Sequence, residues 1–434
     1  MKVTGIIAEY NPFHNGHAYH LRQTRKELGS DYIVVVMSGN YVQRGAPTII
    51  DKYSRCEMAL KCGADLVLEL PTCFSTASAE YFAFGGISIL DKLGVVDDLC
   101  FGTESLDQSI LNDGTVPEGA SENIIDYFER IAELLINETA EFKVIVQNDM
   151  KQGLSNAAAI SDAVGKILGE DYQKVMETSN NILGVEYMKA LKRLKSNIKP
   201  EPIARMLSAH NSTAIIEGFS SATAIRNAIY NKYDMNSLRS TVPDGVFEII
   251  MDKYLESFPI FRDDFSTILG EKLITAERAE DLAGYFGISL DLANRIFNER
   301  KNFRSFNQFR ELINCKSISK ATVGRALMHI TLGIKDSDME KMYNADNLKA
   351  VRVLGFKKSA EPLLSEIKKK GSIKMITKLA DYIPDGQTEM SEDGSIVPDM
   401  ITQTINADLL YRMICMNKFD VEMKTPWEQP VRII

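Results

Sequence analysis

Three of the five histidines in the chain, His14, His17 and His20, fall within seven residues near its beginning. They follow an apolar run, Val3 to Ile7, that has the length of a buried strand, and they open a pattern that predicts an amphipathic helix to about Leu28. The first N–H groups of a helix have no partner inside it and can bind an anion. Histidine side chains at such a point can donate hydrogen bonds to phosphate oxygens. The spacing therefore predicts a phosphate site at His14 and His17, whereas His20 alone would be an ordinary surface histidine.

A second candidate site is the string SSATAIR, residues 220–226. Ser221 and Thr223 stand at a predicted helix start, where hydroxyl groups cap free N–H groups and can bond phosphate. Arg226 lies about one turn further on and can bind a leaving pyrophosphate through two N–H groups. Hydroxyl caps followed by an arginine are common, so this string alone is weak evidence.

Two further residues follow predicted strands. Gly102 ends an apolar segment, and ligands of open α/β sheets bind beyond the carboxyl ends of the strands. Arg44 lies in the loop GNYVQRGAP, where it could hold a carboxylate or a phosphate, or simply be solvated. Gly102 could equally belong to an ordinary turn at the end of a strand, so the sequence is compatible with a ligand-binding or a structural role for each residue.

Alternating strand and helix patterns must position these residues. Such alternation predicts parallel βαβ units and thus a Rossmann-like α/β domain. We expect this domain to cover residues 1–233, followed by a helical domain at 234–340 and a small α/β region at 341–434. The strands are predicted at Val3 to Ile7, Asp31 to Ser38, Ala64 to Leu70, Val95 to Phe101, Pro202 to Leu207 and, near the end, in VRVLGF and Lys374 to Thr377.

Composition excludes several classes of protein. The 434 residues are 45% hydrophobic and 25% charged, which is typical of a globular protein. No leader pattern and no apolar run long enough to span a bilayer is visible, so we expect a cytoplasmic protein. Six cysteines lack the spacing of a zinc site, and no dedicated acidic metal cage is visible. The net charge of −9 argues against general coating of nucleic acid but allows one local basic surface.

The string EYNPFHNGH carries a more specific resemblance. HNGH is similar to the HxGH signature of the nucleotidyltransferase superfamily, and the longer string resembles the bacterial tRNA(Met) cytidine acetate ligase family. The resemblance is strong to about residue 230 and weaker beyond. It implies that ATP and acetate form acetyl-adenylate and pyrophosphate. The acetyl group then passes to N4 of the wobble cytidine of elongator tRNA(Met). Mg²⁺ would be expected to neutralise the phosphates.

The resemblance also implies site residues. His14 and His17 would be catalytic, and Ser221, Thr223 and Arg226 match the superfamily's Ser-Thr-x-Ile-Arg motif, with Ala222 where a second Ser often stands. Ser220 or Ser221 would supply that hydroxyl. The implied ATP-binding residues are Ile7, Ala8, Glu9, Tyr10, Asn11, Pro12, Phe13, His14, Asn15, Gly16, His17, His20, Gly102, Asn180, Arg205, Ser221, Thr223 and Arg226.

Basic runs are candidates for RNA binding, although such runs are more often solvated faces. The residues chosen are Lys189, Lys192, Arg193, Arg300, Lys301 and Arg304. Two alternatives stay open. A nucleotidyltransferase that makes a dinucleotide coenzyme would use the same HNGH, but such enzymes can be much shorter. A non-catalytic RNA-binding protein would have little need for intact HNGH and SATAIR.

Overall fold

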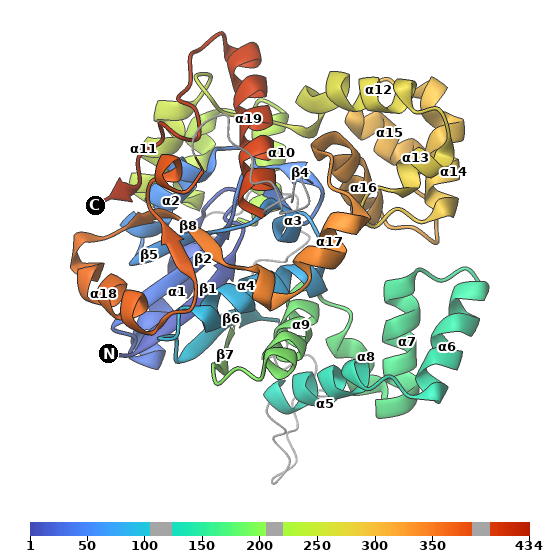
Figure 1. Cartoon of the computed structure of the whole chain (residues 1–434), viewed down its shortest axis with the longest axis horizontal. Coiled ribbons are helices and arrows are strands. Elements are labelled where there is room, and N and C mark those ends of the chain that lie inside the picture. The colour runs from blue at the N-terminus through green and yellow to red at the C-terminus, as the bar shows by residue number, and fades with distance from the viewer. Residues whose placement is uncertain (105–123, 205–219, 384–399) are drawn as a thin grey trace, which may run out of the picture.

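The structure is a computed structural model that describes residues 1–104, 124–204, 220–383 and 400–434 (Figure 1). One large sheet lies at its centre, with strands in the order β10-β8-β5-β2-β1-β6-β7 and with β9 paired to β8. The strands β2, β1, β6, β7 and β5 run parallel, as the α/β alternation predicted. Their bounds are β1 Val3–Ala8, β2 Tyr32–Ser38, β5 Leu66–Leu70, β6 Asp98–Thr103 and β7 Lys199–Ala204.

The nearly continuous apolar run of β2 follows from burial on both faces of the sheet. Val34 and Val36 pack into one hydrophobic cluster with α4 (Ala79–Lys92) and α9 (Ser179–Leu194). Their neighbours Val35 and Met37 pack into a second cluster with α1 (Asn15–Leu28), α2 (Lys52–Lys61) and α11 (Asp244–Lys253). Successive side chains of a strand point to opposite faces, so a sheet covered on both sides needs apolar residues at every position.

The helix α1 begins and ends where its sequence provides caps. His14 is its N-cap, and Gly29 at φ 64° is its left-handed C-cap. Between β2 and α2, the predicted loop contains a two-stranded hairpin of β3 (Tyr41–Val42) and β4 (Ala46–Pro47). Asp51 then caps α2 by accepting from the N–H groups of Tyr53 and Ser54.

A helical group lies between β6 and β7. It contains α5 (Ile124–Ile136), α6 (Ala140–Lys151), α7 (Asn156–Leu168) and α8 (Glu170–Val175), and α9 leads back to the sheet. The chain leaves the helical conformation between α5 and α6, at residues 137–139. Thr139 caps α6 by accepting from the Phe142 N–H, which starts a new helix there.

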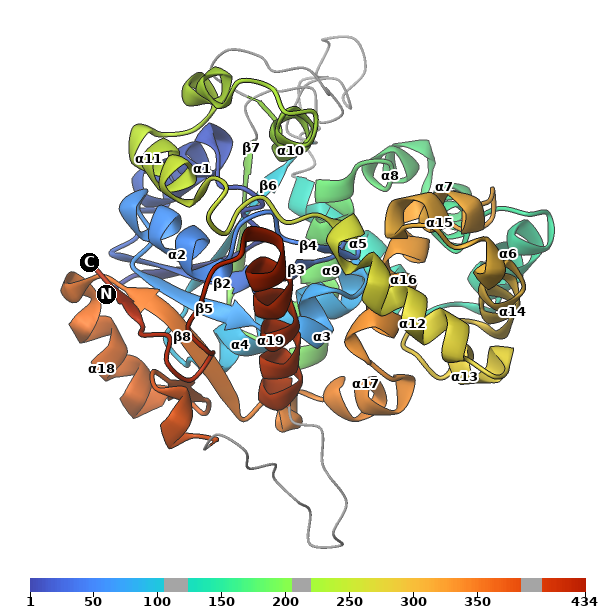
Figure 2. The same ribbon diagram turned by 90° about the horizontal axis from the view of Figure 1, so that it is seen from above.

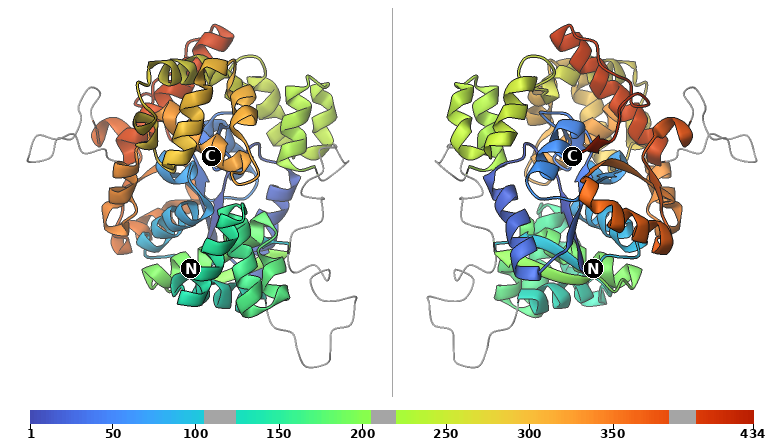
Figure 3. Two further views of the ribbon diagram at one scale, coloured as in Figure 1. Left: turned by 90° about the vertical axis from the view of Figure 1, so that its right-hand side faces the viewer. Right: turned by 90° about the vertical axis from the view of Figure 1, so that its left-hand side faces the viewer.

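A second helical group follows α10 (Ala222–Tyr230) and α11. Its hydrophobic core includes Tyr41 from the β3–β4 hairpin. The hairpin therefore forms the contact, or seam, between this group and the sheet. In the left view of Figure 3 this group, drawn in yellow and orange, lies above the α5–α9 group, drawn in green, and Figure 1 shows both on the same side of the sheet. The group comprises α12 (Ser266–Thr275), α13 (Ala279–Ala283), α14 (Leu290–Glu299), α15 (Phe306–Ile313), α16 (Lys320–Leu332) and α17 (Asp336–Met342).

The last part of the chain returns to the main sheet. The strand β8 (Ala350–Phe356) pairs antiparallel with β5, and β9 (Lys374–Ile376) and β10 (Arg432–Ile433) pair with β8. The helix α18 (Glu361–Lys370) lies beside β8, and α19 (Met400–Phe419) crosses near α3 (Thr72–Ser75), as Figure 2 shows. The boundaries at residues 233 and 340 stay predictions, but the sheet and its core continue across both. The fold class is confirmed, with the small α/β region joined to the main sheet.

Candidate active site

The histidine pair lies where β1 leads into α1. The Nδ1 atom of His14 accepts a hydrogen bond from the Gly16 N–H at 3.1 Å. The Nδ1 atom of His17 accepts from the His14 backbone N–H at 3.3 Å. Because Nδ1 is the acceptor in both rings, each neutral imidazole carries its proton on Nε2. The helix cap therefore fixes the tautomer that provides an Nε2–H donor, the group a phosphate oxygen needs.

Stacking of the two rings fixes their positions. The centroids of His14 and His17 are 3.7 Å apart and their planes differ by 22°. A Cβ atom at residue 16 would lie 2.9 Å from Cε1 of His14. We expected Gly16 to let the backbone approach a ligand; in the structure it makes room for the His14 ring. A side chain at Gly16 would push that ring out of the stack.

Aromatic residues of the preceding loop pack against the ring of His17. Tyr10 and Phe13 are buried, and their ring centroids lie 4.7 and 5.5 Å from that of His17. Burial raises the pKa of Tyr10 far above its usual value, so its hydroxyl stays neutral. Both residues were predicted to bind ATP, and their place in the core indicates that they act by holding His17.

Arg226 joins the second candidate string to the first. Its Nη1 donates to the carbonyl oxygen of Asn11 at 2.6 Å, and its Nη2 donates to Thr223 Oγ1 at 3.0 Å. Ser221 is the N-cap of α10 and accepts from the Ala224 N–H at 3.1 Å. Burial and the nearby Arg44 lower the pKa of Arg226 to about 10, while Glu9 opposes them, so the guanidinium remains charged at neutral pH. The two strings thus form one site, with Ser221 as the capping hydroxyl.

The end of β6 forms the third side of this site. Gly102 pairs with Ile203 in the parallel register, beside the end of β1. Asn180 Nδ2 donates to Glu104 Oε1 at 2.6 Å. The buried Asn181 accepts from Thr103 Oγ1 at 2.9 Å and from the Glu104 N–H at 3.2 Å. Asn180 and Asn181 therefore attach α9 to the strand end next to Gly102.

Arg55 is a residue of this site that the sequence analysis missed. It is fully buried in α2, and its Nη1 donates to the carbonyl oxygens of Glu9 at 2.7 Å and Ser38 at 3.0 Å. Its Nη2 donates to the carbonyl of Gly39. These carbonyls follow β1 and β2, so one guanidinium holds both loops of the site. Arg55 lies in an ordinary helical pattern among other charged and polar residues, so no local signal marks this role.

The other residues predicted to bind ATP lie in different parts of the structure. Ile7 and Ala8 end β1, Pro12 is buried in the loop, and Asn15 donates to the carbonyl of Ser240 at 2.9 Å. His20 Nε2 lies 3.2 Å from Cys100 Sγ, against the sheet. This contact gives His20 a structural partner, and its role in binding ATP stays a prediction. Arg205 lies outside the described residues.

The basic residues predicted to bind RNA differ in how exposed they are and in which residues they contact. Lys189 is buried and contacts Glu186 of the same helix at 2.8 Å and Glu80 of α4 at 3.6 Å, so it cannot reach RNA and its prediction is corrected. Arg193 also contacts Glu80, at 2.6 Å, but it is exposed and stays a candidate. Arg300 stacks on Phe297, with the guanidinium carbon 3.6 Å from the ring centroid. Lys192, Lys301 and Arg304 are exposed and stay candidates.

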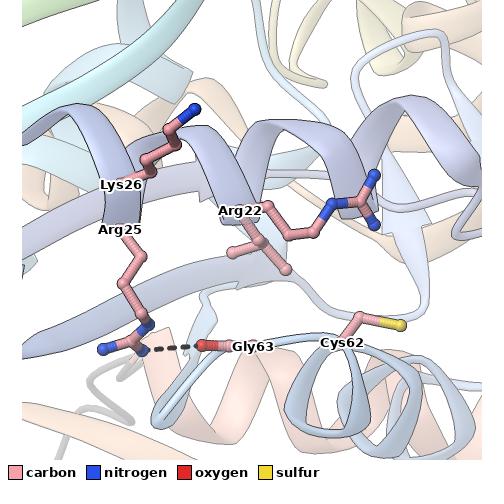
Figure 4. A pocket seen from close by; sticks show the side chains of 6 residues that line it. Arg22, Arg25, Lys26, Cys62 and Gly63 are labelled. Carbon is pink, nitrogen blue, oxygen red and sulfur yellow. Dashed lines mark hydrogen bonds between the residues drawn. The ribbon is translucent and has the colours of Figure 1, made fainter.

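A pocket lies on another part of the domain, away from the histidine pair. A cavity of about 350 Å³ lies beside α1 and the turn before β5 (Figure 4), where Arg25 donates to the Gly63 carbonyl at 3.0 Å. It is lined by Leu21, Arg22, Arg25, Lys26, Cys62 and Gly63 and by no residue predicted to bind ATP. Within the described ranges, no group of three or more His, Cys, Asp or Glu side chains could hold a metal ion.

Comparison with known proteins identifies the family of the chain. Residues 1–425 match the model of the HIGH Nucleotidyl Transferase family. The tRNA(Met) cytidine acetate ligase of Acetivibrio thermocellus is 38% identical over 88% of this chain and 89% of its own. That of Clostridium novyi is 36% identical over 94% of this chain and 97% of its own.

Two solved structures are also similar over the whole chain. Both are of Thermotoga maritima TmcAL, with 30% sequence identity. The match to the apo form has a TM-score of 0.88 and covers 100% of both chains. The match to the form bound with alpha-thio ATP has a TM-score of 0.85 and covers 100% of this chain and 99% of the other. The chain therefore belongs to the tRNA(Met) cytidine acetate ligase family of HIGH nucleotidyl transferases.

Proposed function

We propose that this protein uses ATP to join acetate to the wobble cytidine of elongator tRNA(Met). The observation that carries the proposal is the pair of Nε2–H donors on His14 and His17, with Arg226 bound to the same loop. Hydrogen-bond donors fixed before the reaction stabilise charge that develops in the transition state. This arrangement suits attack on a phosphate and requires no covalent enzyme intermediate.

The first step forms acetyl-adenylate. An acetate oxygen attacks the α-phosphorus of ATP, the bond from that phosphorus to the bridging oxygen breaks, and pyrophosphate leaves. His14 and His17 would donate to the phosphate oxygens. Arg226 and the start of α10 at Ser221 would bind the leaving pyrophosphate. Gly102 and Asn180 border the same edge of the sheet and would contact the nucleoside.

The second step transfers the acetyl group. The N4 amine of cytidine attacks the carbonyl carbon, the bond from that carbon to the phosphate oxygen breaks, and AMP leaves as the amine loses a proton. The described residues around the histidine pair contain no obvious base for this proton. An activated acyl group needs mainly correct placement beside the amine, so the protein would act here by positioning.

Magnesium would arrive with the nucleotide. Mg²⁺ in nucleotide sites is commonly bound through substrate phosphates and a few carboxylates, so we expect the substrate to be the Mg²⁺ complex of ATP. A tRNA-modifying role also fits action in the cytoplasm, where ATP and tRNA occur together. Among the described helices, none has the length and apolar character that crossing a bilayer requires.

Exchange of labelled pyrophosphate into ATP tests the first step. We expect exchange that depends on acetate, weaker exchange with formate or propionate, and none with nicotinamide mononucleotide. If the mononucleotide instead supports product formation and acetate does not, the protein makes a dinucleotide coenzyme. Absence of exchange with every substrate would favour a non-catalytic RNA-binding protein.

A further inference from the structure

The loop between β2 and α2 connects the active site to the second helical group. The Gln43 N–H donates to Glu9 Oε1 at 3.0 Å, next to the histidine loop. On the other side, Arg262 donates from Nε to the Gly45 carbonyl and from Nη2 to the Arg44 carbonyl, both at 2.8 Å. Gly45 itself lies against Gly324 of α16, because an added Cβ would come within 2.1 Å of that backbone.

Four arginines line this connection. Arg226 stands at the nucleotide end, Arg262 holds the loop, Arg44 projects from it, and Arg310 of α15 lies beyond Gly324. The Cδ atom of Arg310 is 3.6 Å from the position of a Cβ at Gly324. The row therefore begins at the ATP site and extends into the helical group, across the seam between the two parts of the molecule.

Several donors in this row lack a protein partner. Arg44 is exposed, and its guanidinium has no hydrogen bond or ion pair within the described part of the chain. Arg310 is only 19% exposed and bonds Glu311 through Nη2, but its Nε is buried without a partner. The side-chain Nε2 of Gln43 is buried without a partner as well. Unpaired buried donors are costly, so together with the exposed Arg44 these groups leave hydrogen-bonding capacity for acceptor oxygens at this place.

Repulsion within the row points to the charge of a ligand that would bind there. Burial and the charges of Arg310, Arg226 and Arg44 lower the pKa of Arg262 to about 9, and Asp263 opposes them. The nearby carboxylates already have other partners. Asp263 accepts from Asn307 at 2.7 and 3.0 Å, and Glu311 also pairs with Lys320 at 2.6 Å. A polyanion would relieve this repulsion, whereas acetate has a single charge.

We propose that Arg44 and Arg310 bind phosphates of the RNA strand next to the nucleotide that receives the acetyl group, with Arg262 positioning Arg44. The inference rests on the proposed function. If N4 of a cytidine reaches an acyl group beside His17, the phosphodiesters on either side of that nucleotide must lie close to the ATP site. Pyrophosphate is expected at Arg226 and α10, so the arginines on the other side of Glu9 are left for the RNA. Contacts to phosphate would fix the strand without reading its sequence.

The test compares two double variants with equal loss of charge. One carries Arg44→Gln and Arg310→Gln; the control carries Arg239→Gln and Arg278→Gln, whose side chains are 67% and 70% exposed on other surfaces. Affinity for an unmodified elongator tRNA(Met) transcript is measured by filter binding at two salt concentrations. Acetate-dependent pyrophosphate exchange is measured beside it, because that half reaction needs no RNA.

We expect the first double variant to bind tRNA at least about tenfold more weakly, and the control to bind like the wild type. The slope of log affinity against log salt should fall by about 1.4, since about 0.7 counterion is released for each single-strand phosphate contact. Exchange should stay within about twofold of wild type. Arg44→Lys should keep most of the affinity, because lysine still provides a point charge.

Two results would overturn the inference. Unchanged tRNA affinity and salt slope would mean that the arginines are solvated. Lost exchange at unchanged tRNA affinity would assign them to the nucleotide. The single variant Arg44→Gln gives the same comparison without disturbing a buried residue. If the wild type shows no acetate-dependent exchange, the proposed function fails, and the tRNA measurement still decides whether the arginines bind RNA.

Discussion

The two ring nitrogens of His14, and likewise those of His17, have different roles. Nδ1 completes the cap of α1, while Nε2–H is the donor that we propose for the phosphate oxygens. The two roles can be separated, because the side-chain oxygen of asparagine can replace Nδ1 as an acceptor but cannot replace Nε2–H.

We therefore predict that His17→Asn lowers acetate-dependent exchange by on the order of 10² to 10³. Its melting temperature should stay near that of the wild type. His17→Ala should lose a similar rate and also about 1 kcal/mol of stability, because the cap is gone. Exchange rates and thermal melting of both variants provide the check. If His17→Asn exchanges normally, His17 serves the helix alone.

At the level of elements, the β3–β4 hairpin positions the active-site loop only if it can dock on α16. Gly45 has φ +58° and faces the Gly324 backbone, whereas Gly29 has φ +64° with nothing near its Cβ position. Gly29→Ala should cost about 1 to 2 kcal/mol from backbone strain alone. Gly45→Ala should cost clearly more, because strain and a backbone clash add. Urea unfolding of the two variants measures this difference, and equal costs would contradict the docking.

Elements also show what the sequence could and could not predict. The apolar run of β2 and the HNGH and SATAIR strings carried local signals, so the sheet and most of the site were predictable. The carbonyl contacts of Arg55 join residues 46 and 17 positions apart, so no local pattern marks them. The pairing of β8 with β5 joins residues nearly three hundred positions apart, and neither strand specifies its partner. For this reason the end of the chain was expected to form its own region.

Over the whole molecule, buried charges attach α19 to the sheet. Lys52 is 0% exposed and contacts Glu69 at 2.5 Å and Asp408 of α19. Asp408 also accepts from Asn40 at 2.9 Å. Asp408→Asn should lower the free energy of unfolding by about 3 to 5 kcal/mol, because the buried Lys52 then keeps only Glu69 and the buried Arg352 loses its ion pair.

The control is Asp381→Asn, which removes an exposed pair with Lys378 and should cost less than about 1 kcal/mol. Urea unfolding monitors both variants. Equal small effects would show that α19 is held by packing instead of by this charge network.

A buried histidine couples α16 to the end of α3 and makes the stability of the molecule depend on pH. His329 Nδ1 lies 2.8 Å from the Phe286 carbonyl, and Nε2 lies 3.1 Å from that of Thr76. Burial lowers the pKa of His329 from 6.5 to about 4. The unfolded chain therefore binds the proton more readily, and stability is lost as the pH falls from 6.5 towards 4.

Lowering the pH from 7.5 to 5 should reduce the free energy of unfolding by about 2 kcal/mol, because His329 takes up a proton in the unfolded chain. His329→Asn should lack this part of the pH dependence. Urea unfolding at both pH values provides the comparison. Parallel pH profiles for wild type and variant would mean that His329 titrates normally in the folded protein.

The central claim is that one active site activates acetate with ATP and transfers it to tRNA. The direct measurement is mass spectrometry of nucleosides from an elongator tRNA(Met) transcript incubated with the protein, ATP and ¹³C-labelled acetate. We predict labelled N4-acetylcytidine at the wobble position, absent without ATP, absent with His17→Asn and absent from a transcript with uridine at that position. An unmodified transcript under conditions that support acetate-dependent pyrophosphate exchange would contradict the account.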